Sequence, residues 1–170
     1  MTDGHYDMVM KARAQAGTGN RLYFAYSTIL DPEAFAEWKA QHSYDSFALG
    51  PGVVAEATGV ELTYDFMSRW WGGRVAGLAD ATGKSVWGKL FTVTEKDWPI
   101  VQHKEGAITG MCVERVVRVK TPEGEVEAWA FTTAPARRQL EGPLSENFKV
   151  ALVRGAQAAG LPESWIASLR

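Results

Sequence analysis

One carboxylate of this chain stands where a side chain could transfer protons. Glu105 precedes Gly106 in a short loop that includes Gly110 and runs directly into a strand-patterned stretch, residues 111–120. The glycines let the loop bend, and the strand behind it would fix the position of the carboxylate. A general acid or base needs both properties. Because most glutamates before a glycine are solvated loop residues, the local sequence alone makes Glu105 only a candidate.

A second stretch, far from Glu105 in the chain, offers a binding site for an anion. Residues 21–26 have the aromatic pattern of a short strand, and Asp31 followed by Pro32 predicts a helix that ends near Ala40. The residues between them, 27–30, therefore form a strand-to-helix corner. Such a corner presents unpaired backbone N–H groups and the positive end of a helix dipole, which favour a bound carboxylate.

The elements that must position these two stretches are strands, turns and helices in irregular order. We expect strands over residues 60–66, 74–79, 85–93, 113–119 and 126–131, and helices over 95–101, 145–159 and from 162 onward. A turn at 80–83 would join the second strand to the third, and a turn at 122–124 would join the last two. Hairpins without regular βαβ alternation indicate an α+β fold.

Length and composition limit the classes of protein. With 170 residues and 46% hydrophobic content, we expect one domain over residues 21–170, preceded by a tail or short helix over residues 1–20. The net charge is −2 with both signs interleaved, which predicts no nucleic-acid partner. No apolar run approaches the roughly 18 residues of a membrane span, and no signal-peptide core is present. The single cysteine, Cys112, fits a reducing cytoplasm.

Several motifs in one order resemble the γ-glutamylcyclotransferase-like family. They span residues 21 to about 169 and comprise Tyr23-Phe24-Ala25-Tyr26 before the corner, Gly73-Arg74-Val75-Ala76, Val86-Trp87-Gly88, Glu105-Gly106 with Gly110-Met111, and Gly155-Ala156 with Gly160-Leu161-Pro162. The resemblance implies a small mixed β-barrel with flanking helices. Fold analogy alone does not fix the chemistry.

The resemblance also implies a reaction. A γ-glutamyl amine, amide or dipeptide would bind through its α-carboxylate at the corner, and Glu105 would move a proton from the α-amine to the departing amine. The product would be 5-oxoproline, and the reaction needs no cofactor and no metal. The expected substrate-binding residues are Tyr26, Ser27, Thr28, Ile29, Leu30, Gly106, Cys112 and Phe131. A homodimer is compatible with the sequence, which does not fix the oligomeric state.

The chain departs from the family pattern at residues that should line the site. Ser27 stands in place of a glycine, Ile29 in place of a polar residue, and Cys112 and Phe131 in place of tyrosines. If the family glycine has a positive φ, Ser27 would carry strain of order 1 kcal/mol. Two alternatives therefore stay open. The chain could be a non-catalytic member that binds a small ligand or partner, or an amide hydrolase that activates water at Glu105.

Other conspicuous residues favour structural roles. We expect Cys112 to be a small buried residue rather than a nucleophile, because no dedicated histidine accompanies it. Trp70 and Trp71 suit core or rim packing better than a wall for an amine substituent. The pairs Glu114-Arg115 and Arg137-Arg138 are expected on solvated faces.

Overall fold

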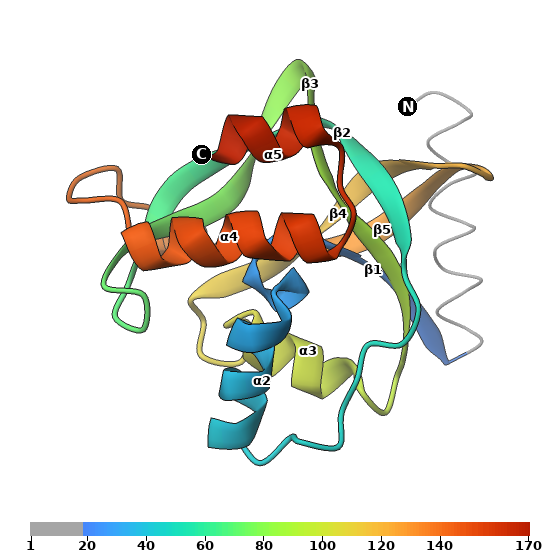
Figure 1. Cartoon of the computed structure of the whole chain (residues 1–170), viewed down its shortest axis with the longest axis horizontal. Helices are drawn as coiled ribbons and strands as arrows, with labels where there is room; N and C mark the ends of the chain where they lie inside the picture. The colour runs from blue at the N-terminus through green and yellow to red at the C-terminus, as the bar shows by residue number, and fades with distance from the viewer. Residues whose placement is uncertain (1–18) are drawn as a thin grey trace.

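A closed five-stranded barrel forms the centre of the computed structural model, which describes residues 19–170 (Figure 1). The strands, in chain order, are β1 (Asn20–Ala25), β2 (Val53–Ser68), β3 (Gly73–Thr94), β4 (Cys112–Thr121) and β5 (Gly124–Thr133). Around the barrel their order is β1-β3-β2-β4-β5, and consecutive neighbours in this order are antiparallel. The seam from β5 back to β1 is parallel and has one paired position, Tyr23 with Trp129. The expected α+β barrel is confirmed, whereas the expected tail over residues 1–20 falls almost wholly outside the described residues.

The long strand β3 corrects one prediction. Residues 74–79 and 85–93 were expected to be two strands joined by a turn, but they belong to one strand, of which residues 73–80 and 85–90 pair with β2. Val60 pairs with Asp80 and Thr58 with Ser85, so residues 81–84 bulge out opposite the single residue Gly59. These turn-forming residues make a bulge of several residues, which bends β3 without reversing its direction.

Within residues 19–170, six helical segments flank the barrel. They are η1 (Thr28–Leu30), α2 (Pro32–Gln41), α3 (Trp98–Lys104), η2 (Pro135–Arg137), α4 (Glu146–Ala158) and α5 (Glu163–Leu169). Asp31 and Ser145 cap α2 and α4 through their side chains, as predicted. The helix expected over residues 95–101 begins and ends three residues later, because Pro99 fits only in a first helical turn.

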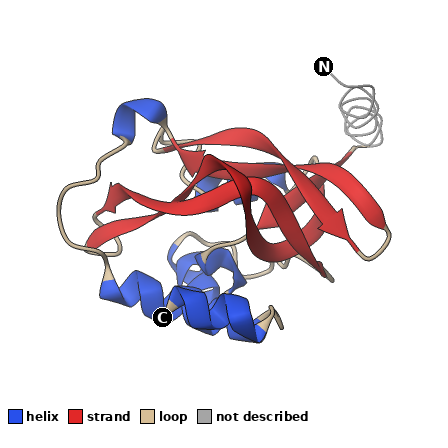
Figure 2. Ribbon diagram, turned by 90° about the horizontal axis from the view of Figure 1, so that it is seen from above, coloured by secondary structure: helices blue, strands red, loops and turns tan. Residues whose placement is uncertain are grey.

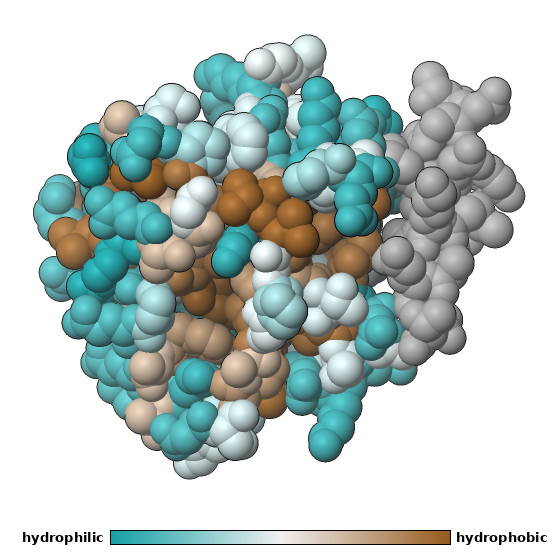
Figure 3. All heavy atoms as spheres, turned by 45° about the vertical axis from the view of Figure 1, so that its right-hand side comes forward, coloured by the Kyte–Doolittle hydropathy of each residue, from teal (hydrophilic) through white to brown (hydrophobic). Residues whose placement is uncertain are grey.

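The apolar side chains form three packed groups around the barrel. One fills the barrel and includes Phe24, Val86 and Val119, and a second lies beside α2 and α3 and includes Tyr23 and Trp98. The third joins α4 and α5 to the outer faces of β2 and β3 (Figure 2). Figure 3 shows apolar residues gathered across the middle of one face, with hydrophilic residues around them. None of the helices in residues 19–170 is long and apolar enough to cross a membrane.

Gly88 allows β3 to pass close to β1. A Cβ atom at this position would lie 2.2 Å from the carbonyl oxygen of Ala25 and 2.8 Å from the ring of Phe24. Backbone cannot yield as a flexible side chain can, so any larger residue would push β1 outward. Since β1 leads directly into the corner at residues 27–30, the glycine at this position also sets where that corner lies.

We predict that Gly88→Ala lowers the free energy of unfolding by about 3 kcal/mol, because the added methyl group overpacks the contact with β1. Denaturant unfolding monitored by circular dichroism measures this change. Gly83→Ala is the control. Gly83 has φ +79° and no atom within 4 Å of the added Cβ, so we expect only the backbone cost of about 1 kcal/mol. Equal losses in the two variants would contradict the role assigned to Gly88.

Candidate active site

Glu105 lies at the C-terminus of α3, where a tight loop returns the chain to the barrel. Its N–H donates to the carbonyl of Val101 at 2.9 Å, which completes the last turn of the helix. Gly106 follows with φ +79°, and its carbonyl accepts hydrogen bonds from the N–H groups of Met111 and Cys112, both at 3.1 Å. The loop thus closes onto the first residue of β4. A half-buried carboxylate is held on a fixed backbone, as the sequence predicted.

Tyr23 is the direct partner of Glu105. Its hydroxyl donates a hydrogen bond to Oε1 of Glu105, and its ring contacts Trp98 and Phe131 edge-on, with centroids 5.9 Å away in each case. Tyr23 was expected only as part of a family motif and was not predicted to belong to the site. Strand alternation predicts that Tyr23 and Tyr26 lie on opposite faces of the strand. It does not predict which of the two faces Glu105.

The surroundings of Glu105 prepare it to accept a proton. Burial raises the pKa of its carboxyl group, and the opposing effects of the Lys104 ammonium and the Tyr23 hydrogen bond do not cancel this rise. Burial and the Glu105 charge raise the pKa of Tyr23 well above its usual range, so the shared proton stays on the phenol. A carboxylate with a raised pKa is a stronger base than an exposed glutamate.

The structure brings Tyr26, Cys112 and Phe131 to the same end of the barrel as Glu105. The Tyr26 hydroxyl donates to the carbonyl of Phe131 at 2.5 Å, and burial and then the Glu105 charge raise the Tyr26 pKa. Burial, Glu105 and Asp65 raise the pKa of Cys112 to about 12, so this residue remains a thiol. The Phe131 ring lies in the core beside Tyr23 and Trp98. Its backbone carbonyl, rather than its side chain, makes the polar contact.

The corner at residues 27–30 is a single 3₁₀ turn. Leu30 donates its N–H to the Ser27 carbonyl at 3.1 Å, so this N–H is taken, contrary to the expectation of four free groups. Among residues 19–170, the N–H groups of Ser27, Thr28 and Ile29 donate to no acceptor. The side chains of Thr28 and Ile29 are buried. Ser27 has φ −122°, which is ordinary extended backbone, and the expected strain is absent.

Helix α4 clamps this corner in place. The Asp31 carboxylate has no exposed surface and accepts three hydrogen bonds from the Arg154 guanidinium. Nε donates to both carboxylate oxygens, and the shortest bond comes from Nη2 at 2.6 Å. Gly155 lies against the same segment, since a Cβ there would be 2.8 Å from the Asp31 nitrogen. One buried carboxylate therefore fixes the start of α2, the corner before it and the helix across it.

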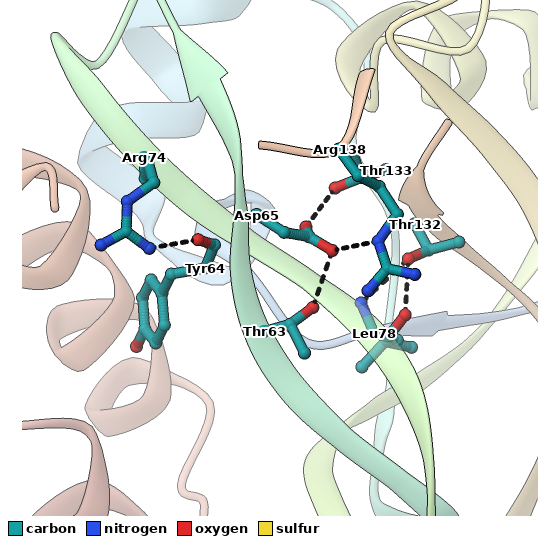
Figure 4. Close-up of polar contacts among 8 residues, drawn as sticks. All are labelled: Thr63, Tyr64, Asp65, Arg74, Leu78, Thr132, Thr133 and Arg138. Carbon is teal, nitrogen blue, oxygen red and sulfur yellow. Dashed lines mark hydrogen bonds and ion pairs between the residues drawn. The ribbon is translucent and has the colours of Figure 1, made fainter. Parts of the chain in front are cut away.

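A second polar group lies at this end of the barrel and was missed from the sequence. Asp65 is 1% exposed and accepts hydrogen bonds from Thr63, Thr133 and Arg138 (Figure 4). Arg137 and Arg138 are both exposed, as expected, but Arg138 also forms an ion pair with the buried Asp65. A lone aspartate in a strand gives no sequence signal for such a cluster, because Thr133 and Arg138 are 68 and 73 residues away in the chain.

Other expectations have mixed outcomes. Glu114 accepts hydrogen bonds from Trp98 and Gln102 and ties α3 to β4, so it does not lie on a solvated face. Trp70 is 51% exposed, and Trp71 packs on Phe148, as rim and core residues do. In residues 19–170 no three histidine, cysteine, aspartate or glutamate side chains gather as metal ligands.

Comparison with known proteins gives consistent results. A model of the AIG2-like family matches residues 85–169, half of the chain. The γ-glutamylcyclotransferase of Mus musculus is 26% identical over 105 residues, which are 61% of this chain and 54% of that protein. The γ-glutamylcyclotransferase of Homo sapiens is 28% identical over 96 residues, 56% of this chain and 50% of that one. The chain thus matches about half the length of these curated relatives.

The overall fold is also that of a solved structure. A γ-glutamyl cyclotransferase superposes with a TM-score of 0.71 at 23% identity, over 88% of this chain and 86% of the other. At this level of identity the likeness shows the shared fold and nothing finer.

We predict that Tyr23→Phe raises the pKa of Glu105 further, because the lost hydrogen bond favours the charged carboxylate. A carboxyl-carbon NMR titration of the labelled glutamate measures the shift. The control is Tyr64→Phe, since the Tyr64 ring contacts Phe148 on the side of α4. A Glu105 pKa that falls or stays constant in Tyr23→Phe would refute the proposed hydrogen bond.

Proposed function

Because this chain belongs to the AIG2-like family of γ-glutamylcyclotransferase-related proteins, we propose that it is a γ-glutamyl cyclotransferase. Its substrate would be a small γ-glutamyl amine or amide, from which it releases 5-oxoproline. The observation that supports this most is the buried Glu105 carboxylate, which is hydrogen-bonded by Tyr23 and has a raised pKa. A proton acceptor in this state, without an adjacent nucleophile or metal cluster among the described residues, suits a reaction in which the substrate supplies the nucleophile.

In the proposed reaction the α-amine of the γ-glutamyl group attacks its own γ-carbonyl carbon. Glu105 takes one proton from the α-ammonium, and a carbon–nitrogen bond forms to close the five-membered ring. The ring nitrogen loses its second proton to solvent, and the bond to the departing amine breaks. Glu105 then returns the proton to that amine, so one carboxylate serves as base and then as acid. Intramolecular attack removes the need for an enzyme nucleophile, and acid–base catalysis contributes roughly 10²–10⁴-fold.

We propose that the corner at residues 27–29 binds the α-carboxylate of the γ-glutamyl group. The three N–H groups of Ser27, Thr28 and Ile29 are not used within residues 19–170, and backbone donors of this kind suit an anion. The clamp between Asp31 and Arg154 would keep these donors oriented when the site is empty. A fixed set of donors lowers the entropic cost of binding.

In this proposal Tyr23 orients the Glu105 carboxylate, and Gly106 lets the loop turn back toward Cys112. Cys112 and Phe131 shape the site as apolar walls, and the reaction proceeds without a cofactor. A free, protonated thiol at Cys112 is compatible with a reducing cytoplasm as the location of the protein.

A non-catalytic member of the family is the second candidate. This candidate is supported by Cys112 and Phe131, which stand in place of the tyrosines of the family and have no hydroxyl group. Such a protein would bind γ-glutamyl compounds without releasing 5-oxoproline. Hydrolysis by water activated at Glu105 would instead release free glutamate.

One assay distinguishes the three functions. Purified protein is incubated with a panel of γ-glutamyl amines and γ-glutamyl dipeptides, and 5-oxoproline and glutamate are quantified separately by mass spectrometry. The cyclotransferase predicts 5-oxoproline, and the hydrolase predicts glutamate. Binding without either product supports the non-catalytic alternative and refutes the enzyme proposal.

We predict that Glu105→Gln lowers turnover at least about 100-fold while substrate binding is retained, because the amide cannot accept the ammonium proton. Steady-state kinetics and calorimetry measure the two quantities. Glu95→Gln, at an exposed position, should change neither. Turnover of the Glu105 variant within a few-fold of wild type would eliminate Glu105 as the base.

The same variant gives a stability test of the buried carboxylate. The pKa of Glu105 is raised in the folded state, so its contribution to stability is full below the unfolded pKa and is lost as pH rises through the folded pKa. We therefore expect Glu105→Gln to gain stability relative to wild type as the pH increases over this range. Urea unfolding at a series of pH values measures it, and a stability difference independent of pH would contradict the raised pKa.

A further inference from the structure

The Asp65 carboxylate is a buried group on β2, and it accepts three hydrogen bonds from side chains. Its Oδ1 accepts from Thr133 Oγ1 at 2.6 Å, and its Oδ2 accepts from Thr63 Oγ1 and from Arg138 Nε, both at 3.0 Å (Figure 4). Its side chain is 2% exposed. Gly77 leaves the space for this group, since a Cβ there would lie 2.7 Å from Thr133 Oγ1.

Asp65 lies at the same end of the barrel as Glu105. Its neighbours Tyr64 and Phe66 pack toward α4, and Asp65 is the unpaired residue of the β-bulge between them. Its hydrogen bonds to Thr133 and Arg138 show that its carboxylate faces the end of β5. Thr133 is paired with Cys112 across β4 and β5, and the Cys112 N–H donates to the carbonyl of Gly106 beside Glu105. After burial and the Glu105 charge, the Asp65 charge also raises the pKa of Cys112. Asp65 and Glu105 are therefore both close to Cys112.

Arg138 is fixed by Asp65 and still has hydrogen-bond donors to offer. Its Nε is bound, whereas Nη1 and Nη2 donate to no acceptor among residues 19–170, and the side chain is 53% exposed. The backbone is held as well, because Gln139 donates its N–H to the Asp65 carbonyl at 2.7 Å and Arg138 forms a bridge with Phe66. A guanidinium that is bound only through Nε still has the N–H groups of Nη1 and Nη2, and these can donate to a carboxylate.

We propose that Arg138 determines specificity by binding a carboxylate on the part of the substrate that leaves as the amine. This inference rests on the proposed cyclotransferase function, in which the corner at residues 27–29 already takes the α-carboxylate of the γ-glutamyl group. Asp65 is then a positioning residue for Arg138. Because Asp65 orients the guanidinium before any ligand binds, little of the arginine's freedom is lost on binding. The preferred substrates would be γ-glutamyl amino acids or peptides rather than γ-glutamyl alkylamines.

The test compares two substrates that differ only in this carboxylate, γ-glutamylalanine and γ-glutamylethylamide. We expect wild type to prefer γ-glutamylalanine in kcat/KM by about tenfold or more, since an ionic hydrogen-bonded pair discriminates strongly. Arg138→Gln should reduce this preference to within about twofold by raising the KM for γ-glutamylalanine alone. Arg137→Gln, at the exposed neighbouring position, should retain the full preference.

Arg138→Gln leaves the buried Asp65 charge without its ion-pair partner, which could destabilise the fold. Two further variants control for this loss of stability. The double variant Asp65→Asn/Arg138→Gln removes that charge, and it should show the same lost preference. Arg138→Lys keeps the charge without the planar fork and should give an intermediate preference. Thermal unfolding verifies that each variant is folded at the assay temperature.

Other outcomes overturn the inference. If wild type shows no preference, or if Arg138→Gln slows both substrates equally, Arg138 only fastens the chain after β5 to the barrel. If wild type releases no 5-oxoproline from either compound, the cyclotransferase proposal fails, and calorimetric binding of the same two compounds decides the role of Arg138. If γ-glutamylalanine binds more tightly than γ-glutamylethylamide, and Arg138→Gln abolishes this difference, the proposed role of Arg138 is supported. Equal binding, or none, refutes it.

Discussion

The buried carboxylate of Asp31 is the contact on which the geometry of the site depends. It ends the 3₁₀ turn after β1, caps α2 through two backbone N–H groups and pairs with Arg154 on α4. Burying a charge is costly unless its hydrogen-bonding capacity is used, so only one arrangement of these three elements satisfies it. The close approach at Gly155 excludes looser arrangements. The orientation of the backbone donors before Asp31 is therefore set by a helix more than 120 residues further along the chain.

Away from this corner, the chemistry of Glu105 is set by partial desolvation. Burial raises the pKa of the carboxyl group, while the Lys104 ammonium and the Tyr23 hydroxyl lower it in part. The barrel holds the carboxylate in position, and the flanking helices bury it from solvent. This division explains how a small α+β barrel can place a proton acceptor without any metal ligand set among its described residues.

The sequence predicted those features that local chemistry determines. Asp31 and Ser145 were found as caps because capping depends on the next three residues, and the loop after Glu105 was found because glycines mark it. The contact between Tyr23 and Glu105 was missed because 82 residues separate the two and strand alternation does not identify which face is the inner one. The pairing of Asp65 with Arg138 was missed for the same reason, since barrel closure alone brings them together.

The parallel seam between β1 and β5 gives the barrel an unequal resistance to deformation. Every other pair of neighbouring strands is joined at three or more positions, but this seam is joined at one, and that position is Tyr23. The residue that closes the cylinder is thus also the hydrogen-bond donor to the general-base candidate. The Tyr23 backbone closes the seam and the Tyr23 hydroxyl holds Glu105, so a local opening of this least supported seam would move the donor away from the carboxylate.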